Sequence, residues 1–419
     1  MFYNAQHMRS MDTLSKLAFL GRQMLLEPAE EVESAHRSGG APAPCGHTPA
    51  ELSRIFGGDP RRESVSLSET KKNSLGIHEA IMPGGKRIKL LKTLLTSACE
   101  RNCYYCPFRA GRDFRRATFK PEEMARAFAE LKQRGIAEGL FLSSGIVGGG
   151  VRTQDRLIDT AAILRRKLDY RGYLHLKLMP GSERDQVLEA MTLADRVSVN
   201  LEAPNPDRLS RLAPKKIFLA ELLQPLKWAA EIRKTMPPPY RGRWPSLVTQ
   251  FVVGAAGESD VELLQTTAYL TATLGLGRVY FSAFHPVHDT PLENVPPENP
   301  WREHRLYQAS FLLRDYGFQF EDLPFTADGR LPLDVDPKLG WARLNLRESP
   351  VEVNRAGREE LLKVPGIGPR GADAILAARR VRALREVKQL RQLGIAADRA
   401  APFIVLDGRR PATQLALGL

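Results

Sequence analysis

Three of the chain's four cysteines stand within eight residues, at Cys99, Cys103 and Cys106. Thiolates this close in sequence can hold three corners of a [4Fe–4S] cluster, and the fourth iron then has no protein ligand. An iron without a protein ligand can bind a small molecule, so such a cluster can take part in chemistry as well as carry electrons. The spacing therefore predicts a catalytic iron–sulfur site.

Two other interpretations of these cysteines stay open. A structural zinc site takes four ligands, usually in two pairs, whereas the remaining cysteine, Cys45 near His47, lies more than fifty residues earlier. Plain buried thiols are a weaker alternative, because three of them rarely crowd into one polar turn. We expect Cys45 to be a free thiol.

The composition narrows the class of protein. A chain of 419 residues, 43% of them hydrophobic, is long enough for two or three domains, and four cysteines are too few for a disulfide scaffold. The most apolar stretch near the N-terminus, residues 17–26, is interrupted by Arg22 and Gln23, so we expect no signal peptide. Because no run is long enough to span a bilayer, we expect a cytoplasmic protein without a membrane partner.

The charge of the chain indicates a polyanionic partner, nucleic acid first. Lys and Arg number 61 against 48 Asp and Glu, a net charge of +13. The last 69 residues, from Val351, contain 13 basic and 7 acidic residues, a local charge of +6. Basic residues also surround the cysteine segment, at Arg101, Arg109, Arg112, Arg115, Arg116 and Lys120. A basic, solvated surface with no partner is the alternative.

Short apolar runs alternate with segments of helical period from residue 89 onward, which predicts six βα units. Expected strands cover 90–95, 139–143, 173–178, 196–201, 247–253 and 278–284, and the helices after them cover 121–134, 153–168, 184–194, 220–235, 260–274 and 301–316. Such units curl into an α/β fold, a partial (β/α)6 TIM-like barrel, whose ligands bind at the carboxyl ends of the strands. The cysteine loop directly follows the first strand.

The predicted domains follow from this pattern. Residues 1–75 form an N-terminal arm, partly helical, with a helix expected over 11–26. Residues 76–325 form the barrel, 326–350 a linker, and 351–419 a small all-α domain.

The small domain contains a turn rich in glycine between two helical segments. Asn354 is the expected N-cap of the first helix. The turn and its flanks resemble a helix-hairpin-helix DNA-binding domain, which implies phosphate contacts around the following residues: Lys363, Gly366, Ile367, Gly368 and Arg370. The glycines permit the tight turn, Ile367 packs between the helices, and backbone N–H groups face phosphate. Binding should be largely independent of DNA sequence and sensitive to salt. A helical protein-docking module is the alternative.

The cysteine spacing, with Tyr105 before the last cysteine, resembles the radical S-adenosylmethionine (SAM) superfamily. The resemblance implies two cofactors, a [4Fe–4S] cluster and SAM. It also implies that the open iron binds the amino and carboxylate groups of SAM. One electron then breaks a carbon–sulfur bond, and the resulting 5′-deoxyadenosyl radical abstracts hydrogen from a substrate.

The same resemblance implies SAM contacts at strand ends. The candidates are Tyr105, Ser143, Ser144, Gly145, Asn200, Glu202 and Gln250, followed by Lys177 and Gly254. His285 and His288 follow the sixth expected strand, where either could handle protons or be a plain loop residue. Asn200 and Glu202 alternate on the fourth expected strand, so their side chains should share a face. The alternative is that these polar groups only cap loops. The sequence leaves open whether the Lys177 side chain faces SAM or lies on the outer side of its strand.

Residues 82–92 together with the hairpin domain are similar to a family of putative DNA modification or repair radical SAM proteins. This resemblance implies a uracil-DNA-glycosylase-like partner, and radical chemistry requires an electron donor that the sequence does not identify. The predicted function is therefore hydrogen abstraction from a DNA-associated substrate. Two alternatives stay open: a radical SAM enzyme that modifies RNA, and a non-catalytic DNA-binding protein with a redox-sensing cluster.

Overall fold

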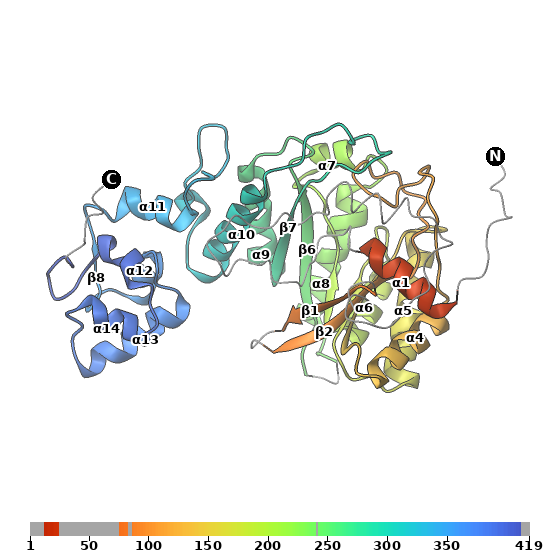
Figure 1. Ribbon diagram of the computed structural model, residues 1–419, viewed down its shortest axis with the longest axis horizontal. Helices are drawn as coiled ribbons and strands as arrows, with labels where there is room; N and C mark the ends of the chain where they lie inside the picture. The colour runs from red at the N-terminus through yellow and green to blue at the C-terminus, as the bar shows by residue number, and fades with distance from the viewer. Residues whose placement is uncertain (1–11, 25–74, 83–85, 240–241, 412–419) are drawn as a thin grey trace. The chain divides into compact units, whose positions relative to one another are not determined.

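The computed structural model describes residues 12–24, 75–82, 86–239 and 242–411 (Figure 1). The chain divides into two compact units, residues 1–258 with 272–300, and residues 259–271 with 301–419. Helix α1 (Thr13–Met24) falls inside the helix predicted over 11–26. The remainder of the predicted arm, with Cys45 and His47, lies outside the described residues.

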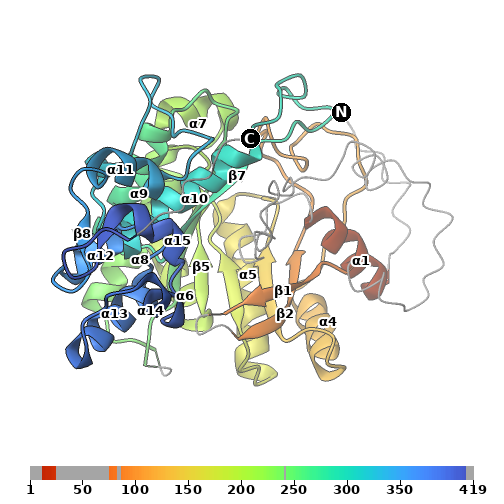
Figure 2. The same cartoon turned by 60° about the vertical axis from the view of Figure 1, so that its left-hand side comes forward.

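The first unit contains a seven-stranded sheet in the order β1-β2-β3-β4-β5-β6-β7 (Figures 1 and 2). Six parallel strands confirm the predicted α/β half-barrel; they are β2 (Arg87–Leu94), β3 (Gly139–Ser143), β4 (Leu174–Lys177), β5 (Arg196–Ser198), β6 (Ser246–Val253) and β7 (Arg278–Ala283). Strand β1 (Ile77–Ile81) was not predicted, and it pairs antiparallel with β2 through Ile77 and Leu91.

Helices connect the parallel strands, and most of those in the first unit lie beside one another along one face of the sheet (Figure 2). In the first unit they are α4 (Pro121–Gln133), α5 (Gly150–Ala162) with the π-helical turn Ile163–Lys167, α6 (Arg184–Leu193), α7 (Pro206–Leu212), and α8 (Gln224–Thr235), which follows the π-helical turn Phe218–Leu223. Helix α4 begins as the sequence predicts, with Pro121 in its first turn and two acidic residues near its positive end. Helix α9 (Asp260–Leu274) crosses the boundary between the units.

The second unit is mainly helical. It contains α10 (Pro300–Asp315), α11 (Pro337–Asn345), α12 (Arg358–Lys363), α13 (Pro369–Val381), α14 (Val387–Gln392) and α15 (Ala397–Ala400), with 3₁₀ turns at Phe320–Asp322 and Ala401–Phe403. The predicted small domain was all-α, whereas the structure adds a parallel pair of two-residue strands, β8 (Val351–Glu352) and β9 (Ile404–Val405). No helix among the described residues has the length and apolar composition needed to cross a membrane.

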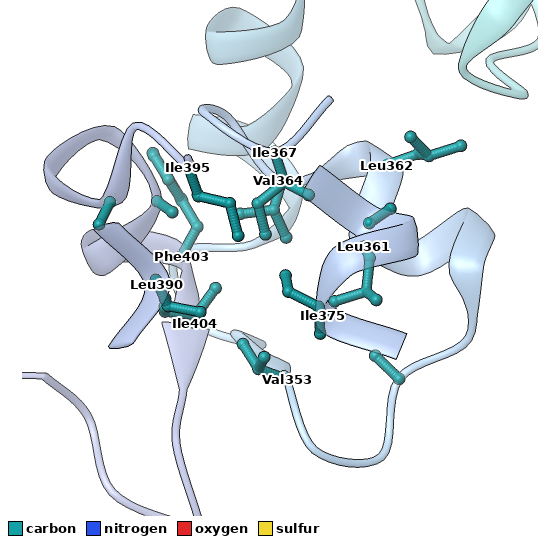
Figure 3. Packing of buried hydrophobic residues seen from close by; sticks show 14 of the residues in the cluster. Val353, Leu361, Leu362, Val364, Ile367, Ile375, Leu390, Ile395, Phe403 and Ile404 are labelled. Atoms are coloured by element: carbon teal, nitrogen blue, oxygen red, sulfur yellow. The ribbon is translucent and has the colours of Figure 1, made fainter. Parts of the chain in front are cut away.

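Helix α11 lies inside the segment predicted as a linker. Its start carries ordinary helix signals, since the Asp336 side chain accepts a hydrogen bond from the backbone N–H of Leu339 at 2.9 Å and Pro337 follows the cap. Ala342 of α11 is buried in the apolar cluster of the C-terminal helices, together with Ile367 and Ile375 (Figure 3). Residues 337–345 therefore pack with the small domain.

The predicted cap of α12 is wrong by three residues. The structure places Gly357 at the N-cap, because the chain after β8 makes a turn before the helix starts. The Asn354 side chain instead donates to the backbone carbonyl of Leu384 and accepts from its N–H, both at 2.8 Å. Asn354 therefore joins the turn before α12 to the segment that follows α13.

Candidate active site

The cysteine loop leaves the carboxyl end of β2 and runs alongside the end of β3. The backbone N–H of Leu95 donates to the carbonyl of Ser143 at 2.8 Å, and Gly145 donates to Thr96 at 2.7 Å. Cys103 is buried, whereas Cys99 and Cys106 are half-buried. All three thiols therefore lie where parallel strands end, as the sequence predicts for a ligand site.

Gly145 allows the two loops to approach each other. A Cβ atom at this position would stand 2.1 Å from the backbone oxygen of Ala98, so no other residue fits without moving the cysteine loop. The next N–H, of Ile146, points at the sulfur of Cys99 at 3.5 Å. Ser143 and Ser144 are buried, and the Ser144 hydroxyl donates to the Gly145 carbonyl at 2.7 Å. The SAM contacts predicted for this turn stay predictions, and its observed role is to hold the cysteine loop.

Glu100, inside the cysteine loop, anchors the next glycine turn. Its carboxylate accepts hydrogen bonds from the backbone N–H groups of Gly148 at 2.9 Å and Gly149 at 3.0 Å. Both glycines have positive φ, +71° and +92°. Sequence reasoning missed Glu100, because nothing in the spacing shows that two distant N–H groups would meet its carboxylate.

A buried ion pair lies next to the cysteine loop. The Nζ atom of Lys216 stands 3.0 Å from Oε1 of Glu202, and the two side chains are 9% and 5% exposed. Glu202 has a φ of +65°, unusual for a residue with a side chain. Hydrogen bonds with β6 hold it there, from its N–H to the Gln250 carbonyl at 2.9 Å and from the Val252 N–H to its own carbonyl at 2.8 Å.

The electrostatics link this pair to the thiols. Burial alone would lower the pKa of Lys216, but the nearby Cys103 and Glu202 outweigh burial and raise it. Burial raises the pKa of the Cys103 thiol, and the Lys216 ammonium opposes that rise. Burial and the Glu202 carboxylate raise the pKa of Tyr105 well above its usual value. Cys103, Tyr105, Glu202 and Lys216 therefore share one electrostatic environment. Sequence analysis predicted three of them and missed Lys216.

Several buried polar atoms at the carboxyl ends of strands have no hydrogen-bond partner among the described residues. They are Asn102 Oδ1 after β2, Asn200 Oδ1 and Glu202 Oε2 after β5, and His285 Nε2 after β7. Burial lowers the pKa of His285. Because buried polar atoms in proteins normally have partners, atoms of this kind at one edge of a sheet indicate a place for a polar ligand.

The reason given for pairing Asn200 with Glu202 is wrong. The two residues were expected to alternate on a strand that reaches residue 201, but β5 ends at Ser198. The direction of Glu202 comes instead from its positive φ and its bonds to β6. The two residues still lie at the same strand end, and Gln250 of β6 is buried beside them, with its carbonyl bound to Glu202.

Lys177 lies on the polar face of the sheet. Lys92, Phe141 and His175 are neighbours in register on β2, β3 and β4, and the rings of Phe141 and His175 are 4.5 Å apart. The ammonium groups of Lys92 and Lys177 lie 5.4 and 5.6 Å from the centre of the Phe141 ring. Leu174 and Leu176 alternate with these residues on the other face. Lys177 therefore lies on the face of the sheet that carries Lys92, Phe141 and His175.

The arginines around the cysteine loop serve the loop itself. The Arg116 guanidinium donates to the backbone carbonyls of Ser97 at 2.8 Å and Phe108 at 3.0 Å. Arg112 is buried and donates to the Pro107 carbonyl, and Arg101 pairs with Glu221 at 2.6 Å. Three of the six basic residues of the expected rim therefore hold the loop in shape, and a phosphate contact at the other three stays a prediction.

The donor set fits a cluster with one open iron. Among the described residues, no three His, Cys, Asp or Glu side chains are arranged around a single metal ion. A four-iron cluster is larger than one ion, so its ligands stand further apart. Three thiols on one anchored loop supply three sulfur ligands, the Lys216 cation opposes the rise in the pKa of Cys103 that burial causes, and the unpartnered Glu202 Oε2 offers an acceptor to a cationic ligand.

Residues 93–270 match the sequence model of the Radical SAM superfamily, a range that contains all three cysteines, Glu202 and Lys216. This part of the chain is therefore a radical SAM enzyme domain, and the cofactors of that superfamily are a [4Fe–4S] cluster and SAM. The match confirms the radical SAM class and both predicted cofactors. The comparison with curated proteins gave no match.

Solved structures with a similar fold include the FeFe-hydrogenase maturase HydG from Carboxydothermus hydrogenoformans, with 16% identity, a TM-score of 0.43, and coverage of 54% of this chain and 51% of that one. Methylornithine synthase (PylB) has 15% identity and a TM-score of 0.43 over 55% and 63% of the two chains. The radical SAM methyltransferase TsrM from Kitasatospora setae has 16% identity and a TM-score of 0.38 over 52% and 39%. The chain thus spans about half the length of HydG.

Proposed function

We propose that this chain is a radical SAM enzyme whose substrate is DNA or is held on DNA. The observation that carries the first half is the buried Glu202–Lys216 pair beside three cysteines on one loop. The support for the second half is the glycine hairpin between α12 and α13, in a domain that is strongly basic in sequence.

Different residues of the site would bind the cluster and SAM. Cys99, Cys103 and Cys106 would hold the cluster, which when bound supplies the electron that starts radical chemistry on SAM. The buried Oε2 of Glu202 suits the ammonium group of SAM, since a charged donor is the strongest partner for a buried carboxylate. Lys216 pairs with that carboxylate, and its ammonium opposes the rise in the pKa of the Cys103 thiol that burial causes.

Two features of the hairpin support the proposed phosphate contact. Gly366 has a φ of +84°, and a Cβ atom there would stand 2.4 Å from the Ala396 carbonyl oxygen. Gly368 is the N-cap of α13, a helix of 13 residues, and Pro369 follows it. The first N–H groups of a helix have no partner within the helix and attract anions.

Two of the residues predicted to contact DNA have other roles in the structure. Lys363 is only partly exposed, pairs with Asp322 at 3.3 Å and lies 4.8 Å from the centre of the Trp341 ring. Ile367 is fully buried in the core, where it packs between the helices as expected (Figure 3). The proposed phosphate contacts are therefore the backbone at Gly366 and Gly368, and Arg370, which is exposed.

The experiment that tests this function combines cofactor turnover with substrate choice. The anaerobically reconstituted protein is given SAM and dithionite with duplex DNA, with RNA, or with neither, and 5′-deoxyadenosine and the mass of the nucleic acid are measured. The proposal expects 5′-deoxyadenosine, and a mass change in DNA alone. A change in RNA alone would favour the RNA-modifying alternative. No 5′-deoxyadenosine under any condition would favour a cluster with a sensing role.

A further inference from the structure

Helix α13 carries an exposed stripe that runs away from the hairpin. The exposed positions are Arg370, Asp373, Ala377, Arg380 and Val381, which follow the three- and four-residue spacing of one helix face. The opposite face is buried through Ala372 and Ile375 (Figure 3). The stripe therefore faces away from the core of the domain.

The charges on this stripe are not balanced. Its one acid, Asp373, is paired with Arg358 at 2.8 Å. Arg370, Arg380 and the adjacent exposed Arg382 form no ion pair with any residue that the structure describes. Among the described residues, three guanidinium groups on α13 and at its end are thus left without an ion pair.

Neighbouring arginines show the contrast. Arg385 pairs with Asp407 at 3.0 Å, and Arg391 pairs with Asp398. Arg379 points inward and donates to the carbonyls of Val353 at 2.9 Å and Ala356 at 2.7 Å. These arginines fix the structure of the domain or are neutralised by an acid, whereas Arg370, Arg380 and Arg382 do neither among the described residues.

We propose that Arg370 and Arg380 on the exposed stripe, with Arg382 directly after the helix, bind the phosphate backbone of duplex DNA along the length of α13; these three residues are here called the α13 basic face. This inference rests on the proposed function and extends it beyond the hairpin. Arg370 and Arg380 are ten residues apart, about 15 Å along a helix. Duplex DNA carries one charge per about 1.7 Å of its axis, so this span meets several phosphates.

The test compares two double variants that remove the same charge. Arg380→Gln/Arg382→Gln removes two members of the α13 basic face, and Arg385→Gln/Arg391→Gln removes two arginines that are ion-paired. The full-length proteins are titrated with a labelled duplex of arbitrary sequence between about 50 and 200 mM salt, where counterion release gives a slope of about 0.9 per phosphate contact.

The first variant should lower the slope of log affinity against log salt by about 2, because each lost phosphate contact removes about 0.9. The control should keep a slope close to that of the wild type, and both should melt within a few degrees of it because all four side chains are exposed. Arg370→Gln should lower the slope by about 1.

Equal slopes for the two double variants, with wild-type binding intact, would overturn the α13 basic face and leave the proposed DNA function standing. Absence of duplex binding by the wild-type protein at the lowest salt would overturn the DNA function and this inference together. The two failures are therefore distinguishable.

Discussion

The ammonium of Lys216 lies 3.0 Å from the carboxylate of Glu202, and both side chains are buried next to Cys103. The pair joins two segments that follow β5, and it lies beside the cysteine loop that follows β2. A negative charge and a positive charge are thereby fixed at the carboxyl ends of the strands, next to the polar face of the sheet. The account of the active site depends most on this contact.

Replacing Lys216 by Met should destabilise the protein and abolish SAM binding. Removing one partner of a buried ion pair typically costs about 3–5 kcal/mol, since the other charge is left uncompensated. The measurement is equilibrium binding of SAM to the reconstituted protein, with the unfolding midpoint. Lys215→Met is the matched control, because Lys215 is exposed. Equal binding by the two variants would contradict the role given to Lys216.

Replacing Gly145 by Ala should reduce cluster incorporation. The new methyl group would stand 2.1 Å from the Ala98 oxygen and push the cysteine loop away from the end of β3. Iron and sulfide content after anaerobic reconstitution is the measurement. Gly277→Ala is the control, since its Cβ would meet nothing closer than 3.6 Å. Wild-type iron content in Gly145→Ala would show that the close approach is not needed.

Lys338 should make stability depend on pH. Burial lowers its pKa from 10.5 to about 7, although Asp336 opposes the fall, and its Nζ donates to the Ile367 carbonyl at 2.5 Å. Arg399 and the Tyr316 ring also face it. Between about pH 7 and 10.5 the unfolded chain binds this proton more tightly than the folded chain, so stability should rise with pH across that window.

The unfolding midpoint, followed from about pH 7 to 10, should therefore rise more for the wild type than for Lys338→Met. Lys388→Met, at an exposed position, should keep the wild-type dependence. Parallel curves for the wild type and Lys338→Met would contradict the prediction.

Replacing Gly366 by Ala should weaken DNA binding and leave SAM cleavage unchanged. The position combines a φ of +84° with a Cβ that would meet the Ala396 oxygen at 2.4 Å. Gly394→Ala is a matched control, because its φ is +77° but its Cβ would meet nothing within 4 Å. Both variants carry left-handed backbone strain of about 1–2 kcal/mol, so a difference in their DNA affinity reports the clash with the Ala396 oxygen. Equal DNA affinity for the two variants would show that the hairpin does not take part in DNA binding.

Much of the fold follows from local patterns in the sequence. The six parallel strands were predictable because each apolar run is short and is followed by a helical segment with its own start and stop signals, as at Pro121 and Gly135. Strand β1 was not predictable from local patterns, because its pairing through Ile77 and Leu91 depends on the neighbouring strand β2. Helix α11 was missed because the surrounding prolines and glycine indicated a linker, although Asp336 caps it.

The site was predictable only where chemistry shows in the spacing. The cysteines and Glu202 were found because of their residue types at strand ends. Lys216 was missed because it lies after α7 and reaches the site only through the tertiary fold. The arginines of the cysteine loop looked like a phosphate surface, but Arg116 uses its guanidinium to hold loop carbonyls. Charge in a sequence does not show which partner it meets.

The most direct test of the central claim is the amount of 5′-deoxyadenosine that the anaerobically reconstituted chain releases from SAM when dithionite is added. The account predicts release by the wild-type protein and none by Cys103→Ala, which lacks one of the three sulfur ligands. A wild-type protein that contains a full cluster yet releases no 5′-deoxyadenosine, or a Cys103→Ala variant that releases as much as the wild type, would contradict it.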